Sequence, residues 1–426
     1  MRPSTAKFRG LNIRPAARVS IAGMAVLAAI GLAACGSSSP PGGGGGGGGA
    51  AATGPLPAIP AGDINVGVSI ATTGALGPLG AQVNAEFSAV VKLFNAQGGI
   101  DGHQIHLISF NDQSDPAVAV AGARQMVADH VAAMFYAGLS ETAAQTLPIF
   151  DANHIPVLQG DSEDQYRNPK VFPYFFPTSP QDAGSIEANV EELKASGITK
   201  VAVLNDSSPI AVDFWIKDFD QSAKQNGITI AGDYTYPLDA VDVSTEVRQA
   251  KATGATTLVV LAEAGLNHVY DALREIGWAP TMYIYPVGYA VGYSDLGSLA
   301  SDAYGSCYVT LPSTTAKFDA EDSKILTDIY AGVADLPGST SDLTAYDSLQ
   351  MLSDAITANK SLDGAAIKAY LEKNVNNKSF STPSVSYSYS PTVHTGIPGS
   401  DVKLCRLDQL GEYKAGVVSP TVSTGL

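Results

Sequence analysis

Between residues 63 and 116 the hydrophobic positions change period twice, and the changes predict a strand, a helix and a second strand. Over residues 63–70 apolar residues alternate with polar or small ones, the two-residue period of a strand. Over residues 83–94 apolar residues recur at spacings of four, four and three, which is one stripe of a helix. A second strand pattern follows, and Asp115-Pro116 then predicts the start of another helix. Such a βαβ unit predicts a parallel sheet.

The same alternation of helix and strand patterns continues to about residue 420, with a break at residues 168–180. Four prolines in this break exclude a helix and indicate an extended crossing between two lobes. After it, helices that end at glycines precede short apolar strands, a pattern typical of a doubly wound α/β sheet. We therefore predict two doubly wound parallel-sheet lobes joined by a three-strand hinge. Lobe 1 is expected to comprise residues 63–178 plus 305–375, and lobe 2 residues 179–304 plus 376–420.

The first 34 residues have the features of a secretory signal peptide, with five basic residues, no acidic residue and a short apolar run. They end in Leu-Ala-Ala before Cys35, the pattern of a bacterial lipobox, so we expect Cys35 to be lipidated. An ordinary signal peptide with a chance cysteine and a signal anchor are the alternatives. Residues 35–62 contain eight consecutive glycines and predict a flexible tether with a reach of about 30 Å. We expect an extracytoplasmic protein held on the membrane only by its lipid.

Charge and composition exclude several functions. Without residues 1–34 the chain has 20 basic and 41 acidic residues, a net charge of −21, which argues against nucleic acid or anionic lipid as a partner. The rest of the chain contains no apolar run of membrane length, so we do not expect a permease. It has no Gly-x-Ser-x-Gly, Walker or Cys-x-x-Cys motif, and its six histidines are scattered. We therefore expect no enzyme and no cofactor or metal site. His103 and His106 lie on one predicted strand and would point to opposite faces.

Four short pieces stand in a fixed order at the start of the globular part. They are Ile-x-Val-Gly-Val at 64–68, Thr-Thr-Gly at 72–74, Leu-Phe-Asn-Ala-Gln-Gly-Gly-Ile-Asp-Gly at 93–102 and Asn-Asp-Gln-Ser-Asp-Pro at 111–116. In this order and spacing they resemble the opening of the periplasmic branched-chain amino acid (Leu/Ile/Val) binding proteins of ABC importers. The resemblance extends to about residue 418. It implies a type I two-lobed fold, a small-molecule ligand between the lobes and an ABC permease as partner; we expect a monomer.

The best candidate for ligand chemistry is the start of the helix after the strand at 131–136. Ligands of open α/β sheets bind beyond the carboxyl ends of the strands. There Ser140, Glu141 and Thr142 open a helix whose N–H groups, with the Ser140 and Thr142 hydroxyls, suit a carboxylate. The resemblance implies that Ser140 holds the ligand carboxylate; the alternative is a serine that only caps the helix.

The resemblance also shows where this chain departs from the family. The family has an aromatic residue near the position of Ile210 and an acid in the segment that contains Val287, and neither is present here. Leu79 also replaces an aromatic residue, and Glu263 is the nearest replacement acid. These departures leave open a carboxylate without an amine, an amide or an aromatic acid as ligand, with cleft walls from Tyr283, Tyr285, Tyr289 and Tyr293. The predicted ligand-binding residues are Thr73, Gly74, Leu79, Ser140, Glu141, Thr142, Asp161, Ser162, Glu163, Ile210, Glu263 and Val287.

Cys307 and Cys405 are the only cysteines after Cys35. Outside the cytoplasm they are candidates for a disulfide, with free buried thiols as the alternative. Taken together, the sequence predicts a solute-binding lipoprotein of an ABC importer that binds an amino-acid-like or carboxylate-bearing ligand in the cleft between its lobes. The alternative is a ligand-sensing extracellular receptor domain of a signalling system.

Overall fold

The computed structural model describes residues 55–137, 139–158, 164–285, 303–307, 324, 340–373, 377–378, 386–399, 402–406, 411–414 and 417–420. The predicted signal peptide, Cys35 and residues 36–54 of the tether lie outside these ranges. Among the helices of the described ranges, none combines the length and apolar character that crossing a membrane requires.

Lobe 1 contains a five-stranded parallel sheet with the strand order β2-β1-β3-β4-β5. Consecutive residues of its strands enter different cores: Phe135 packs in the cluster on one face, whereas Met134 and Tyr136 pack in the cluster on the other. Both faces are therefore covered, as expected for a doubly wound sheet. The strands are β1 (Ile64–Ile70), β2 (Ile105–Phe110), β3 (Met134–Ala137), β4 (Val157–Leu158) and β5 (Phe175–Phe176). The helices are α1 (Gly77–Ala96), α2 (Pro116–Ala128), α3 (Ser140–Ala152), α10 (Thr340–Asn359) and α11 (Gly364–Lys373).

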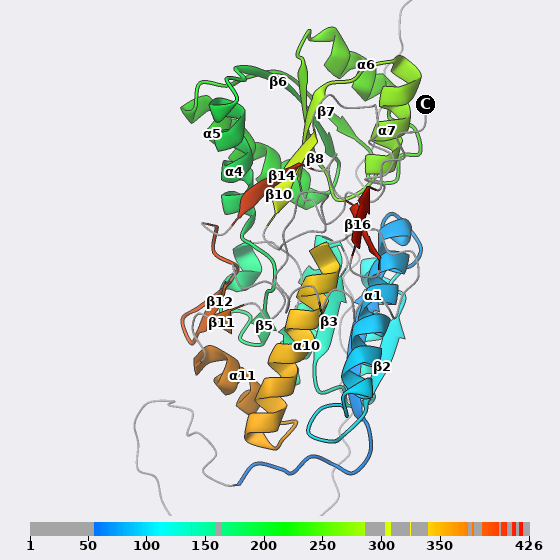
Figure 1. Cartoon of the computed structure of the whole chain (residues 1–426), viewed down its shortest axis with the longest axis vertical. Helices are drawn as coiled ribbons and strands as arrows, with labels where there is room; N and C mark the ends of the chain where they lie inside the picture. The colour runs from blue at the N-terminus through cyan, green and yellow to red at the C-terminus, as the bar shows by residue number, and fades with distance from the viewer. Residues whose placement is uncertain are drawn as a thin grey trace, which may run out of the picture. The chain divides into compact units, whose positions relative to one another are not determined.

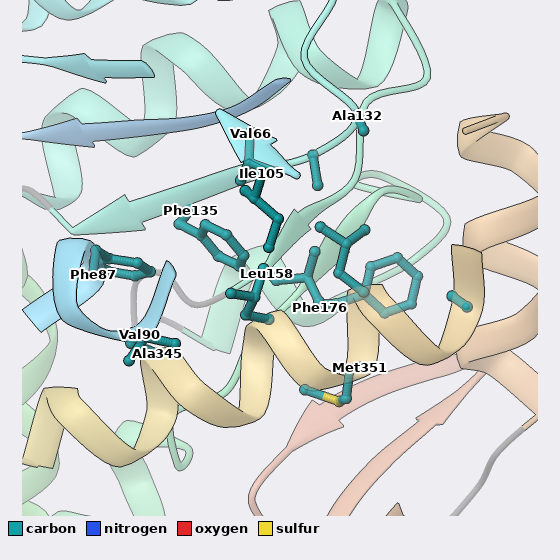
Figure 2. Packing of buried hydrophobic residues seen from close by; sticks show 14 of the residues in the cluster. Val66, Phe87, Val90, Ile105, Ala132, Phe135, Leu158, Phe176, Ala345 and Met351 are labelled. Carbon is teal, nitrogen blue, oxygen red and sulfur yellow. The ribbon is translucent and has the colours of Figure 1, made fainter. Parts of the chain in front are cut away.

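Helices from distant parts of the chain complete the lobe 1 core. Helix α10 runs beside α1, although more than 240 residues separate them in sequence (Figure 1). Figure 2 shows Phe87 of α1 and Ala345 and Met351 of α10 around the strand residues Phe135 and Phe176. The rings of Phe87 and Phe135 are 5.1 Å apart between centroids. Residues of α10 and α11 thus pack in the lobe 1 core.

Lobe 2 contains a six-stranded sheet with the order β14-β10-β9-β8-β6-β7, in which only β14 is antiparallel. Val203 and Leu204, which are consecutive in β6, enter the clusters on opposite faces. The strands are β6 (Lys200–Asp206), β7 (Thr229–Tyr236), β8 (Thr257–Leu261), β9 (Thr281–Tyr285), β10 (Ala303–Cys307) and β14 (Lys403–Arg406). The helices are α4 (Asp182–Ala195), the π-helix η2 (Ala211–Trp215), α5 (Ile216–Gln225), α6 (Ser244–Ala252) and α7 (Leu266–Ile276). The predicted fold class of two doubly wound α/β lobes is confirmed.

The late strands divide between the lobes differently from the predicted boundaries. Strand β10 lies in the lobe 2 sheet, although residues 305–307 were expected in lobe 1. Tyr387, Tyr389 and Ile397, expected in lobe 2, pack in the lobe 1 core. Alternation of serine and tyrosine predicts a strand, but it carries no information about which sheet receives the tyrosines. The remaining strands are β11 (Asn377–Lys378), β12 (Ser386–Ser390), β13 (Val393–Gly396), β15 (Gly411–Lys414) and β16 (Val417–Pro420).

The start of α2 confirms the predicted helix signal at Asp115-Pro116. The Asp115 carboxylate accepts the N–H groups of Ala117 at 2.7 Å and Val118 at 3.1 Å. Proline at the first helical position needs no hydrogen-bond acceptor for its nitrogen. Only residues 111–115 separate the end of β2 from the start of α2, so both elements fix residues 111–114, which belong to the candidate site.

A buried arginine joins two of the crossings between the lobes. Arg167 lies in the short 3-10 helix η1 (Asp164–Arg167) and is 5% exposed. Its guanidinium donates to the carbonyls of Ser179 at 3.2 Å, Pro180 and Thr395, and it lies 3.5 Å from the carboxylate of Asp164. The two crossings also bond directly, since the N–H of Ile397 donates to the Ser179 carbonyl at 3.3 Å.

The carboxyl group of Asp164 gives this hinge a pH dependence. Burial raises its pKa to about 6; Arg167 opposes the rise, Asp182 and Asp218 add to it, and the Ala183 N–H opposes it. The folded pKa lies above the unfolded value of about 3.9, so the folded state binds this proton more tightly. The resulting stabilisation is fully present below pH 4 and is lost as the pH rises through 6.

We expect the free energy of unfolding to fall more between pH 5 and pH 7 in the wild type than in Asp164→Asn. The side chain is 44% exposed, so solvent screening keeps the difference below about 1 kcal/mol. Urea denaturation of both proteins at the two pH values measures it. Parallel pH profiles would show that Asp164 titrates with the same pKa in the folded and unfolded chain.

Candidate functional site

Loops of the two lobes meet at the carboxyl ends of their strands. Ala71, Leu76 and Leu139 of lobe 1 form an apolar cluster with Ala264 of lobe 2, and Ala75 and Leu238 pack against it. We call these six residues the interlobe cluster. Its members follow β1, β3, β7 and β8, so the ends of both sheets face one another here. This is the edge at which open α/β sheets bind ligands.

The loop after β1, which contains Thr73 and Gly74, is held by side chains that follow β2. The side-chain oxygen of Asn111 accepts the N–H of Thr72 at 3.0 Å, and its amide nitrogen donates to the Thr73 hydroxyl at 3.0 Å. Gly74 has a φ of +86°, and a Cβ there would lie 2.2 Å from the carbonyl oxygen of Gln113. Only glycine therefore fits this turn.

Asp112 also helps to hold the loop after β1, through Ser114. This carboxylate is fully buried and accepts the Ser69 hydroxyl and the Ser114 N–H, each at 3.0 Å. The Ser114 hydroxyl in turn accepts the N–H of Leu76 at 3.2 Å. Burial raises the pKa of Asp112, and the bonds from Ser114 and Ser69 lower it. The lobe 1 side of the interlobe cluster is thus positioned by a chain of polar contacts.

The start of α3 supplies the second lobe 1 element of the site. The hydroxyls of Tyr136 and Thr142 donate to the carbonyl of Leu139 at 2.7 and 2.6 Å, which fixes the residue that enters the interlobe cluster. The Thr142 proton is therefore directed at Leu139 and not at a ligand. Helix geometry leaves the N–H groups of Ser140 and Glu141 without carbonyl acceptors in the helix. One carboxylate oxygen of Glu141 is buried and has no hydrogen-bond partner among the described residues.

A buried carboxylate also positions the lobe 2 side. Asp206, at the end of β6, is fully buried, and one of its oxygens accepts the N–H groups of Glu263 at 2.7 Å and Ala264 at 2.9 Å. Its other oxygen accepts the N–H and the hydroxyl of Ser208 at 3.0 and 2.6 Å. Burial raises the pKa of Asp206, and these four bonds oppose the rise. Glu263, a predicted ligand residue, is 2% exposed and has its backbone fixed by this carboxylate.

Several predicted residues lie elsewhere or outside the described ranges. Ile210 is 1% exposed and packs in the lobe 2 core beside Trp215. Tyr283 and Tyr285, expected as cleft walls, lie in the same core, because alternate residues of β9 face it. Asp161, Ser162, Glu163, Val287, Tyr289, Tyr293 and the side chains of Leu79 and Ser140 lie outside the described part of the structure.

The two histidines near β2 contact different groups, and the two cysteines lie on neighbouring strands of lobe 2. His103 contacts the Gly62 carbonyl at 2.8 Å and His106 the Asn65 side chain at 3.1 Å, so each has its own partner. Within the described ranges no three metal-binding side chains come together. Cys307 and Cys405 lie on the paired strands β10 and β14, where Cys405 is opposite Gly305, two positions from Cys307. Such a diagonal pair has typical Cα atoms 7–8 Å apart, slightly beyond the usual range of a disulfide.

Asp112 and Asp206 position loops of the candidate site, although neither was among the predicted site residues. Each stands at or just after the carboxyl end of a strand, the place that the sheet rule selects. An acid in this position was therefore a usable signal. What the sequence does not show is that both carboxylates bind loops of their own lobe instead of facing a ligand.

Comparison with known proteins agrees with this geometry. A family model described as periplasmic binding protein matches residues 63–408. The Leu/Ile/Val-binding protein homolog 1 of Brucella abortus is 28% identical over 151 residues, which cover 34% of this chain and 40% of that relative. The alignment thus spans less than half of the relative's length.

Solved structures show the same fold. The branched-chain amino acid transporter substrate binding protein LivJ of Streptococcus pneumoniae, in complex with isoleucine, has a TM-score of 0.64 at 17% identity and covers 81% of this chain and 99% of its own. An ABC transporter solute binding protein of Rhodopseudomonas palustris, in complex with 4-hydroxybenzoate, has a TM-score of 0.66 at 17% identity, with 84% and 95% covered. Because the family model matches most of the chain, this protein belongs to the periplasmic binding protein family, whose members are extracytoplasmic ligand-binding proteins and not enzymes.

Proposed function

We propose that this protein is the solute-binding component of an ABC importer and that it binds a small carboxylate-bearing molecule between its lobes. The observation that carries the proposal is the position of α3. Leu139 enters the interlobe cluster, so the first turn of α3 begins where the two lobes meet. The first N–H groups of α3, which have no carbonyl acceptor within the helix, and the positive end of the helix dipole favour a carboxylate. Isoleucine and 4-hydroxybenzoate, bound by two similar structures, both carry one.

Two carboxylates close to this place favour a ligand that also carries an amino group or another hydrogen-bond donor. Glu141 follows Ser140 directly and has a buried carboxylate oxygen without a partner among the described residues. Glu263 stands on the facing lobe, next to Ala264 of the interlobe cluster. The ligand carboxylate would be a third anion beside these two, which is costly unless a cation or a hydrogen-bond donor lies between them. An amino acid therefore satisfies this site better than a plain aromatic acid.

We expect Ser140→Ala to weaken the binding of the cognate carboxylate by roughly 10- to 100-fold, the cost of one hydrogen bond to a charged group. Titration calorimetry of both proteins with isoleucine, leucine amide and 4-hydroxybenzoate measures the loss. Leucine amide lacks the carboxylate, so its binding should not change. Ser196→Ala is the matched control, because its hydroxyl bonds Glu192 on the exposed surface at the opposite edge of the lobe 2 sheet. Unchanged affinity of Ser140→Ala would remove the carboxylate assignment.

The same proposal includes the membrane anchor, the oligomeric state and the transport partner. We propose that Cys35 carries the lipid, that the glycine-rich tether holds a monomeric binding domain above the membrane, and that an ABC permease receives the ligand. The placement of Cys307 and Cys405 on paired strands supports a disulfide only with a local adjustment of the backbone.

A further inference from the structure

Lobe 2 contributes Ala264 and Leu238 to the interlobe cluster, and both are held by side chains at the end of the same strand, β6. Both donate their backbone N–H to the segment that ends β6: Ala264 to the carboxylate of Asp206 at 2.9 Å, and Leu238 to the hydroxyl of Ser207 at 3.0 Å. Ala264 and Leu238 come from loops after different strands, β8 and β7. Two consecutive side chains thus hold both of the residues that lobe 2 contributes to the interlobe cluster.

Further bonds make this arrangement rigid. The Tyr236 hydroxyl, at the end of β7, donates to the Ala264 carbonyl at 2.8 Å, so this residue is held at its N–H and its carbonyl. Asp206 uses both oxygens as acceptors, for two N–H groups on one and for Ser208 on the other. An asparagine offers one acceptor oxygen, and its amide nitrogen would face donors. A charged carboxylate is therefore the only side chain of this size that satisfies all four bonds.

We propose that Asp206 and Ser207 are positioning residues for closure of the lobes: they place Ala264 and Leu238 where these residues pack against Leu76 and Leu139. The inference rests on the proposed function in one respect, since closure matters only for a protein that traps a ligand. Burial of apolar surface between the lobes stabilises the closed arrangement and so shifts the closing equilibrium toward it. Neither Asp206 nor Ser207 has to touch the ligand to change its affinity.

Amide hydrogen exchange of the full chain without ligand tests the proposal. We expect Asp206→Asn and Ser207→Ala to speed exchange several-fold in the lobe 1 segments 71–76 and 139–143, which contact lobe 2 through the interlobe cluster. A purely local structural role would change exchange only within lobe 2. Ser196→Ala, which removes a hydroxyl from the opposite edge of the same sheet, should leave lobe 1 unchanged.

Ser207→Ala keeps the test decisive if Asp206→Asn folds poorly, because Ser207 is exposed and loses one hydrogen bond. Changes confined to lobe 2 in Ser207→Ala, or no changes, would overturn the proposal. In a second arm, calorimetry with isoleucine and 4-hydroxybenzoate should show affinity reduced on the order of tenfold in both variants for whichever compound the wild type binds. If the wild type binds neither, the proposed ligand class fails while the exchange result still decides the role of Asp206 and Ser207.

Discussion

Replacing Arg167 with methionine is expected to lower the free energy of unfolding by roughly 3–5 kcal/mol, the usual cost of removing one partner from a buried ionic network. The guanidinium bonds three backbone carbonyls, of Ser179, Pro180 and Thr395, which belong to two crossings between the lobes. Methionine fills the space but donates no hydrogen bond, so the buried carbonyls of Pro180 and Thr395 would lose this donor and the Ser179 carbonyl would keep the N–H of Ile397. Asp164 and Asp182 would also lose the cation beside them.

Arg248→Met is the matched control for this change. Arg248 also pairs with an acid, Glu275, at 2.6 Å, but both side chains are more than half exposed. An exposed pair of this kind contributes about 0–1 kcal/mol. Denaturation of the two variants and the wild type by guanidinium chloride measures the free energy of unfolding and therefore separates the effect of a buried hinge residue from that of a surface ion pair. Similar losses in both variants would show that the carbonyls of the crossings find water instead.

Arg167 also illustrates what the sequence could not show about the hinge. The proline-rich segment after it, residues 168–180, predicts an extended crossing, and in the structure this segment contains turns and the two-residue strand β5 but no helix. The Thr395 carbonyl, however, lies 228 residues away, and no local pattern connects an arginine to a distant backbone oxygen. The same limit explains the late strands: Tyr387 and Tyr389 announce a strand by alternation, but their sheet is decided by contacts with Phe176 and the helices of lobe 1.

Features that depend on neighbours in sequence were predictable. The strand and helix periods, the Asp115 cap and the loops after β1 and β3 follow from local rules, and the structure places those loops at the meeting of the lobes. Ile210 and Tyr285 were expected near a ligand, but they lie in the lobe 2 core. A large apolar side chain near the end of a strand can face either a ligand or the core. Burial of its apolar area favours the core unless the backbone directs the side chain outward.

Asp112 and Asp206 explain how loops so rich in small residues hold a defined shape. Each lobe places one buried carboxylate at a strand end, and each carboxylate accepts donors from loops that reach the interlobe cluster, through Ser114 in lobe 1 and directly in lobe 2. The cost of burying these charges is offset only while all their donors are in place. The contact between the lobes therefore depends on the backbone of these loops, which the two carboxylates hold in place.

Gly80→Ala is expected to reduce ligand affinity by at least tenfold and to destabilise the protein by about 1–3 kcal/mol, the range for an added methyl group in a packed site. Gly80 lies in the first turn of α1, and a Cβ there would be 1.9 Å from the carbonyl oxygen of Ala71. That oxygen belongs to the backbone at the end of β1 and has no side chain that could rotate away. Helix and strand end must separate, which displaces Ala71 and Leu76 from the interlobe cluster.

Gly77→Ala provides the same chemical change three residues earlier in the same helical turn. Its Cβ would meet the Thr72 carbonyl oxygen at 3.5 Å, an ordinary contact, and alanine is the better helix former by up to about 1 kcal/mol. We therefore expect Gly77→Ala to bind isoleucine or 4-hydroxybenzoate as the wild type does and to unfold at an equal or higher temperature. Calorimetry and thermal unfolding of the two variants decide the matter. Equal behaviour of Gly80→Ala and Gly77→Ala would mean that the approach of α1 to β1 does not control the site, because the loop absorbs the methyl group without moving the interlobe cluster.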